Sequence, residues 1–161
     1  MNPKRLIFIH GLEGSSQGYK AKLLRGLFPG ILIPDFTGTL KQRMNRLSHI
    51  LSLRHNWVII GSSFGGLMGA IFACHHPQSV QKLILLAPAL VWPEFACNLP
   101  DPVSTPTVIY HGRDDGVIPL DAVRQLAVQV FINVDIRVMN DDHVLHKTAQ
   151  EIDWLTLLQK D

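Results

Sequence analysis

The 161-residue chain has few of the features that mark specialised classes of protein. Charged residues make up only 17%, the net charge is +2, and no basic run is longer than Lys4-Arg5. A nucleic-acid-binding domain is expected to cluster its basic residues in a stripe or patch, so we expect no nucleic-acid partner. Cysteine is scarce as well. Cys74 lies in an apolar helix-like run and Cys97 in a proline-rich connection, which favours two free thiols in a reducing compartment over a disulfide scaffold.

Long apolar runs are also missing. No run approaches the roughly 20 residues that a membrane-spanning helix needs, so we expect no membrane partner. The opening segment MNPKRLIFIHG has a basic flank but only four apolar residues before His10, too few for the core of a signal peptide. We therefore predict a soluble, cytoplasmic protein. The sequence carries no signal for oligomeric state.

What the chain does have is apolar content: 47% of its residues are hydrophobic. At this length we expect one domain, residues 1–161, with a sizeable core. Short apolar runs alternate with longer segments of helical periodicity. The expected strands are Leu6–Ile9, Ile31–Ile33, Trp57–Ile60, Leu83–Leu86, Thr107–Tyr110 and Val134–Met139. The expected helices are Gln17–Leu27, Leu40–Leu53, Phe64–His75, Leu120–Val130 and Val144–Gln159.

The alternation of these segments predicts the fold class. The first five strands are nearly all apolar, which is typical of parallel strands covered on both faces. This alternation predicts a doubly wound α/β sheet with right-handed crossovers and with helices on both faces. The helix at 40–53 shows the expected stripe: its apolar members are Leu40, Met44, Leu47, Ile50 and Leu51, and its polar members are Lys41, Gln42, Arg43, Asn45 and Arg46.

The segment Ala87–Pro106 is the exception, because it contains five prolines. A helix of any length is therefore not expected there. We expect an irregular loop over the carboxyl edge of the sheet, with at most one short helical turn, and no sizeable lid.

The first chemical motif is Gly61-Ser62-Ser63-Phe64-Gly65, which fits G-x-S-x-G. It stands between an apolar strand and an apolar helix, where a nucleophilic serine needs a sharp turn free of bulky neighbours. Ser63 is the candidate nucleophile, and Ser62 is the lesser one because it lacks glycines two positions away. The alternative is a glycine-rich turn in which Ser63 caps the helix.

A serine nucleophile needs a base and an acid. In VIYHGRDDGVIP, Asp115 follows a strand on a short turn and is the candidate acid, whereas Asp114 is expected to be solvated. In VDIRVMNDDHVLHK, His143 follows the last strand and is the candidate base; His146, one turn further on, is expected to point elsewhere. The alternatives are an ordinary Asp-Gly turn and a structural histidine beside residues that cap a helix.

The order Ser63, Asp115, His143 is that of the α/β-hydrolase triad. With FIHGLEGSS, GSSFGG and HGRDDGVIP, the chain resembles a small, lid-poor α/β-hydrolase, similar to the YqiA-like short bacterial esterases. The resemblance implies about six parallel strands in the order 2-1-3-4-5-6, since larger members carry about two further strands before the first. It departs at position 142, where the family often has glycine and this chain has Asp142.

The same resemblance implies two backbone donors for a developing oxyanion, the N–H groups of Leu12 and Phe64. The loop that carries Leu12 could instead be an ordinary turn that caps the following helix. We expect a serine hydrolase that cleaves small acyl esters, with short acyl chains preferred. Thioesterase, peptidase or acyltransferase activity, and a non-catalytic binding protein of this fold, are the alternatives.

We expect no cofactor and no metal. The pairs His75-His76 and His143/His146 have no carboxylate or cysteine set at the usual ligand spacing. The expected partner is a small-molecule acyl substrate.

Overall fold

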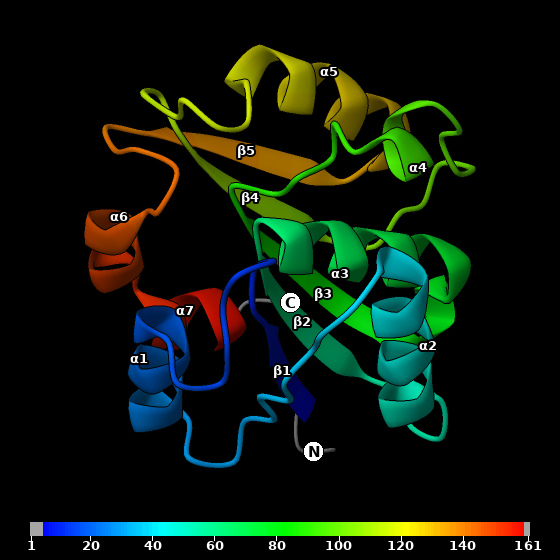
Figure 1. Ribbon diagram of the computed structural model, residues 1–161, viewed down its shortest axis with the longest axis vertical. Coiled ribbons are helices and arrows are strands. Elements are labelled where there is room, and N and C mark those ends of the chain that lie inside the picture. Colours follow the sequence, from blue (N-terminus) through cyan, green and yellow to red (C-terminus); the bar gives the residue numbers. More distant parts are fainter. Residues whose placement is uncertain (1–4, 160–161) are drawn as a thin grey trace.

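The computed structural model describes residues 5–159 (Figure 1). Its centre is a sheet of five parallel strands in the order β1-β2-β3-β4-β5. The strands are β1 (Arg5–Ile9), β2 (Trp57–Ser62), β3 (Val80–Leu86), β4 (Thr107–Gly112) and β5 (Val134–Met139). The helices are α1 (Tyr19–Leu27), α2 (Leu40–Leu51), α3 (Phe64–His75), the 3₁₀ turn η1 (Pro77–Ser79), α4 (Pro93–Ala96), α5 (Leu120–Val130), α6 (His146–Glu151) and α7 (Trp154–Gln159).

Helices cover both faces of the sheet, as the apolar strands predicted. Side chains alternate along a strand, so Ile59 of β2 faces one core while Val58 and Ile60 face the other. Helices α2, α3 and α5 pack on the first core, and α1 and α7 on the second. Figure 1 shows the two layers of helices with the sheet between them. The doubly wound α/β fold class is confirmed.

The sixth expected strand is reduced to a single bridge. Leu32, in the middle of the expected strand Ile31–Ile33, pairs in parallel with Ile7 of β1. The Phe8 N–H donates to the Leu32 carbonyl at 2.9 Å, and the Leu32 N–H donates to the Leu6 carbonyl at 3.0 Å. The segment therefore lies beside β1, where the order 2-1-3-4-5-6 placed it, but the ladder does not continue.

The prediction of one long helix over 144–159 is wrong. The helical structure begins at His146 and is divided into α6 and α7. Ile152 leaves the helical conformation, with φ −61° and ψ 127°. Asp153 then starts a new helix: its carboxylate accepts hydrogen bonds from the N–H and the hydroxyl of Thr156. This is the chemistry of an N-cap.

The proline-rich segment forms a loop that contains only the one-turn helix α4, in agreement with the expected absence of a sizeable lid. In the part of the chain that the structure describes, no helix has both the length and the apolar character needed to cross a bilayer.

Candidate active site

Ser63 lies between the last residue of β2 and the first residue of α3. Its backbone has φ 54° and ψ −112°, a conformation that residues with a side chain rarely adopt and that costs about 1–3 kcal/mol. Hydrogen bonds hold it there: the Ser63 N–H donates to Leu86 at 2.9 Å, and its carbonyl accepts from Leu67 and Ala89. The turn has the geometry of a nucleophile elbow.

The glycines of the motif make this turn possible. A Cβ atom at Gly61 would lie 2.5 Å from the Gly65 carbonyl oxygen, closer than real Cβ atoms come. A Cβ atom at Gly65 would overlap the carbonyl oxygen of Ile9 in β1. The structure therefore gives a steric reason for the small residues around Ser63.

Three side chains from distant parts of the sequence meet at the carboxyl edge of the sheet. The Ser63 Oγ lies 3.0 Å from the His143 Nε2. The His143 Nδ1 lies 2.8 Å from the Asp115 Oδ2. The His143 side chain is 20% exposed and the Asp115 side chain is fully buried. The structure thus places the alcohol, imidazole and carboxylate in series.

The Asp115 carboxylate is held by several groups. Its Oδ1 accepts hydrogen bonds from the N–H groups of Val117 and Ile118, both at 2.8 Å. Its Oδ2, which faces His143, also lies 3.2 Å from the Nε2 of the buried His111. That same Nε2 lies 2.9 Å from the Ile118 carbonyl oxygen, which fixes the ring. No role was predicted for His111 from the sequence, although it begins the HGRDD motif.

The loop that carries His143 is braced against the acid turn. The Asp114 N–H donates to the Asp141 carbonyl at 3.1 Å, and a Cβ atom at Gly112 would lie 2.5 Å from the Asp142 carbonyl oxygen. The Asp141 carboxylate accepts hydrogen bonds from the N–H and the hydroxyl of Thr148 in α6. Burial of this carboxylate would raise its pKa, but the hydrogen bonds from Thr148 and from the Asp142 N–H, together with the charge of Lys147, outweigh burial, and the pKa of Asp141 is lowered.

Asp142, the departure from the family pattern, does not obstruct the site. Its side chain is exposed and accepts a hydrogen bond from the Val144 N–H at 3.0 Å. Asp114 is also exposed, as expected. The His146 ring stacks on Tyr19, with ring centroids 3.9 Å apart, and it is His143 that lies at hydrogen-bond distance from Ser63.

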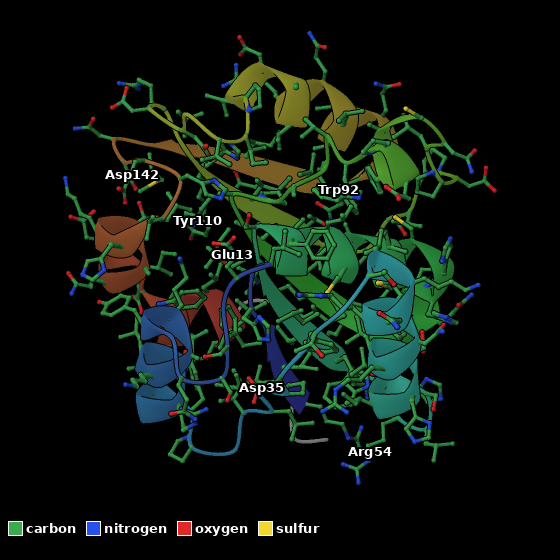
Figure 2. All side chains as sticks on the ribbon, in the orientation of Figure 1. Glu13, Asp35, Arg54, Trp92, Tyr110 and Asp142 are labelled. Atoms are coloured by element: carbon green, nitrogen blue, oxygen red, sulfur yellow. The ribbon has the colours of Figure 1, made fainter. Side chains whose placement is uncertain are left out.

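The two expected oxyanion donors lie on neighbouring strands. Leu12 follows β1, and Phe64 opens α3 directly after β2, with which β1 pairs. As the first residue of a helix, Phe64 has an N–H with no carbonyl partner inside the helix. In Figure 2, Glu13 on the first loop and Trp92 after β3 lie on either side of the start of α3.

Hydrogen bonds from two residues that were given no functional role in the sequence analysis, His10 and Arg43, hold the loop after β1 in place. The buried His10 accepts a hydrogen bond from the Phe36 N–H at its Nε2, so its Nδ1 carries the proton and donates to the Gly11 carbonyl at 2.7 Å. Arg43 of α2 donates to the Leu12 carbonyl at 3.0 Å. Arg43 was counted with the polar members of its helix, yet only 4% of it is exposed.

A cavity of about 200 Å³ opens between the loop after β1 and the start of α1, and none of the three triad residues lines it. Its lining includes His10, Gly11, Lys20, Ser62 and Val144. Burial lowers the pKa of Lys20, and the nearby carboxylates of Asp141 and Asp142 oppose that shift. The lesser candidate Ser62 therefore lines this cavity, whereas Ser63 makes the hydrogen bond to His143. Within residues 5–159, no three His, Cys, Asp or Glu side chains are grouped so as to hold a metal ion.

Comparison with known proteins agrees with this architecture. A family model described as the alpha/beta hydrolase fold matches residues 37–101. The chain is similar to alpha/beta hydrolase domain-containing protein 10 from mouse, with a TM-score of 0.78 and 21% identity over 99% of this chain and 92% of that one. It is similar to Est1E from Butyrivibrio proteoclasticus, solved with ferulic acid bound, with a TM-score of 0.74 and 19% identity over 98% of this chain and 91% of that one.

Two further similarities concern a lipase and an acyltransferase. The monoacylglycerol lipase of Paleococcus ferrophilus has a TM-score of 0.66 and 14% identity over 89% of this chain and 91% of that one. A stretch of 34 residues is 50% identical to a probable 1-acylglycerol-3-phosphate O-acyltransferase of Oryza sativa subsp. japonica. That stretch spans 21% of this chain and only 8% of the relative's length. The sheet order, the helices on both faces and the solved structures agree, and the chain has the α/β hydrolase fold.

Proposed function

We propose that this protein is a serine hydrolase that cleaves small carboxylic esters through Ser63, His143 and Asp115. One observation carries the proposal: the continuous chain from the Ser63 Oγ to the His143 Nε2 at 3.0 Å, and from the His143 Nδ1 to the buried Asp115 Oδ2 at 2.8 Å. A fold alone says little about chemistry, but this series of groups on a strained elbow is what nucleophilic acyl transfer requires. The sequence motifs FIHGLEGSS, GSSFGG and HGRDDGVIP favour a relationship of this protein to the YqiA-like short bacterial esterases.

The proposed reaction has two stages. His143 accepts the proton of the Ser63 hydroxyl while the oxygen attacks the ester carbonyl, and the Asp115 carboxylate stabilises the imidazolium that forms. The tetrahedral oxyanion accepts hydrogen bonds from the N–H groups of Leu12 and Phe64 and then collapses. The alcohol leaves with the proton from His143, and Ser63 keeps the acyl group. A water molecule, deprotonated by His143, then releases the acid and restores the serine.

The surroundings of Ser63 support a small substrate. The loop after β3 contains only the short helix α4, so no sizeable lid covers this edge of the sheet to build a deep acyl pocket. Next to Ser63, the buried Phe64 ring packs edge to face against Trp92, with centroids 5.1 Å apart. We therefore propose that acetate and butyrate esters are preferred over long-chain esters. The two cysteines are free thiols, which supports our proposal of a cytoplasmic location.

The first test is covalent labelling with a fluorophosphonate, followed by hydrolysis of p-nitrophenyl esters of increasing chain length. Ser63→Ala should abolish labelling and lower kcat by about 10⁶-fold, and Asp115→Asn and His143→Ala should also be severely impaired. Ser62→Ala is the matched control and should be labelled like the wild type. An unlabelled wild type without esterase activity would instead favour a binding protein of this fold.

A second candidate is transfer of the acyl group to an acceptor other than water. The short match to an acyltransferase sequence favours it, and the same acyl-enzyme would serve. Adding an alcohol or a thiol during turnover and separating the products distinguishes the two: free acid alone indicates a hydrolase, whereas a new ester or thioester indicates a transferase. Parallel assays on acyl-CoAs and amides test thioesterase and peptidase activity.

A further inference from the structure

Arg43 is an arginine in an unusual place. It lies in α2 on the same face as Leu47 and Leu51, four and eight residues further on, and all three are buried. Only 4% of Arg43 is exposed, whereas arginine side chains are almost never buried unless an acid pairs with them. Among residues 5–159, no carboxylate forms an ion pair with Arg43.

The contacts of the Arg43 guanidinium are all with neutral groups. Its Nε donates to the Gly38 carbonyl at 3.1 Å, and its Nη2 donates to the Leu12 carbonyl at 3.0 Å. Its Cζ lies 5.2 Å from the centre of the Phe64 ring, in cation–π contact. The Nη1 is buried without a hydrogen-bond partner. Burial lowers the pKa of the guanidinium, but arginine remains charged.

A buried charge without a counter-ion is costly for stability, so its presence suggests a use elsewhere. The two residues that Arg43 joins come from different segments: Leu12 from the loop after β1, and Phe64 from the start of α3. They are also the two residues whose N–H groups are the candidate oxyanion donors. Arg43 is thus in direct contact with both of these residues.

We infer that Arg43 is a positioning residue for the oxyanion hole: it holds the Leu12 loop against Phe64 and leaves an unneutralised positive charge beside both donors. The inference rests on the proposed function. Negative charge develops on the substrate oxygen only in the transition state, so both effects should act on kcat more than on KM. A nearby positive charge also favours that oxyanion most strongly where water is excluded.

The alternative is that Arg43 only stabilises the fold. Two substitutions separate these roles. Arg43→Met replaces the guanidinium with an apolar chain and removes an unpaired buried charge, so the thermal midpoint should stay the same or rise. Arg43→Lys keeps the charge but loses the planar fork that reaches Gly38 and Leu12 together. Lys41→Gln, on the exposed side of α2, is the control for loss of one positive charge.

The experiment measures kcat, KM and the thermal midpoint for these variants on one p-nitrophenyl ester. For Arg43→Met we expect kcat to fall about 10- to 100-fold with KM changed less than about 3-fold, which is less than the 10²–10³-fold loss on removing a direct donor. Arg43→Lys should lie between Arg43→Met and the wild type. A boronic acid, which forms a tetrahedral anionic adduct with the serine, should lose affinity in parallel with kcat. Lys41→Gln should match the wild type in every measurement.

Two results would overturn the inference. One is an Arg43→Met variant with kcat within about 2-fold of the wild type. The other is a loss of stability in Arg43→Met with kcat per folded molecule unchanged, which is the signature of a purely structural role. A wild type that hydrolyses no ester and takes up no fluorophosphonate would refute the proposed function instead. In that case, hydrogen exchange at residues 10–16 still tests the anchoring: it should be faster in Arg43→Met, and unchanged exchange would refute it.

Discussion

Replacing Asp115 by asparagine tests the series of hydrogen bonds with a change of one atom. The amide has the volume of the carboxylate, but one oxygen becomes an NH₂ group. The structure decides which one. The Oδ1 accepts hydrogen bonds from the N–H groups of Val117 and Ile118, at 2.8 Å each, and only the amide oxygen can take that place. The NH₂ group must then face the His143 Nδ1, which lies 2.8 Å from the Oδ2.

This orientation forces the wrong tautomer on His143. An NH₂ group donates, so the Nδ1 must accept, and the ring proton moves to the Nε2. The Nε2 faces the Ser63 Oγ at 3.0 Å and can no longer take the hydroxyl proton. Loss of the correct tautomer costs about 10⁴-fold in kcat in a serine protease triad, which corresponds to about 5 kcal/mol of activation free energy. The fold should survive, since the two backbone hydrogen bonds to Oδ1 are kept.

The assay is steady-state hydrolysis of a p-nitrophenyl ester, with the thermal midpoint measured on the same samples. Asp114→Asn, one residue earlier and exposed, is the matched control and should keep wild-type activity. Asp115→Ala should lose activity too, but it should also be less stable because the N–H groups of Val117 and Ile118 lose their acceptor. If folded Asp115→Asn kept kcat within 10-fold of the wild type, the proposed role of Asp115 would be refuted.

Three further predictions concern stability and reactivity. Gly65→Ala should lower the free energy of unfolding by about 3 kcal/mol because its methyl group would overlap the β1 backbone, whereas Gly26→Ala, in open space on α1, should leave it unchanged or raise it by up to about 1 kcal/mol; urea midpoints decide. Asp141→Ala should lower the free energy of unfolding by about 1 kcal/mol at pH 7, because the Thr148 N–H loses its acceptor. Because the folded pKa of Asp141 is lowered from its ordinary 3.8, this contribution is complete above that value and is lost as pH falls through the folded pKa, so equal melting of both proteins at pH 7 would contradict it. Burial raises the pKa of Cys74 to about 12, so a chromogenic disulfide reagent should label the exposed Cys97 quickly and Cys74 only after denaturation; rapid reaction of both thiols would be the contrary result.

Most of the strands were predictable because short, nearly continuous apolar runs are typical of parallel strands that are buried on both faces. The one reduced strand, Ile31–Ile33, shows what composition misses. Leu32 donates its N–H to β1, but the next residue facing the same way is Pro34, which has no N–H to donate. The apolar run was therefore correctly placed, and the proline two positions beyond Leu32 could have predicted that its pairing would be brief.

The division of the last helix also had a signal in the sequence. Asp153 stands three residues before Thr156, the spacing of a side-chain cap, and this cap starts α7. Buried residues occur on both sides of the break, Thr148 and Ala149 in α6 and Trp154, Leu157 and Leu158 in α7, so periodicity alone did not reveal it.

For the site, local motifs were sufficient to choose the residues that the structure brings together: Ser63, Asp115 and His143. What they could not give were the supporting contacts, since those depend on partners far away in sequence. Arg43 is the clearest case. Its spacing from Leu47 and Leu51 already placed it on the buried face of α2, but only the fold shows that this face meets the Leu12 loop.

Attack of the Ser63 oxygen on the substrate carbonyl leaves a covalent acyl-enzyme, and trapping that species is the decisive experiment. The protein is mixed with a p-nitrophenyl ester, quenched in acid within the first turnover and digested for mass spectrometry. We predict one acyl group on the peptide that contains Ser63, present in the wild type and in Ser62→Ala and absent from Ser63→Ala. An acyl group on a different residue, or unchanged hydrolysis by Ser63→Ala, would rule out Ser63 as the nucleophile.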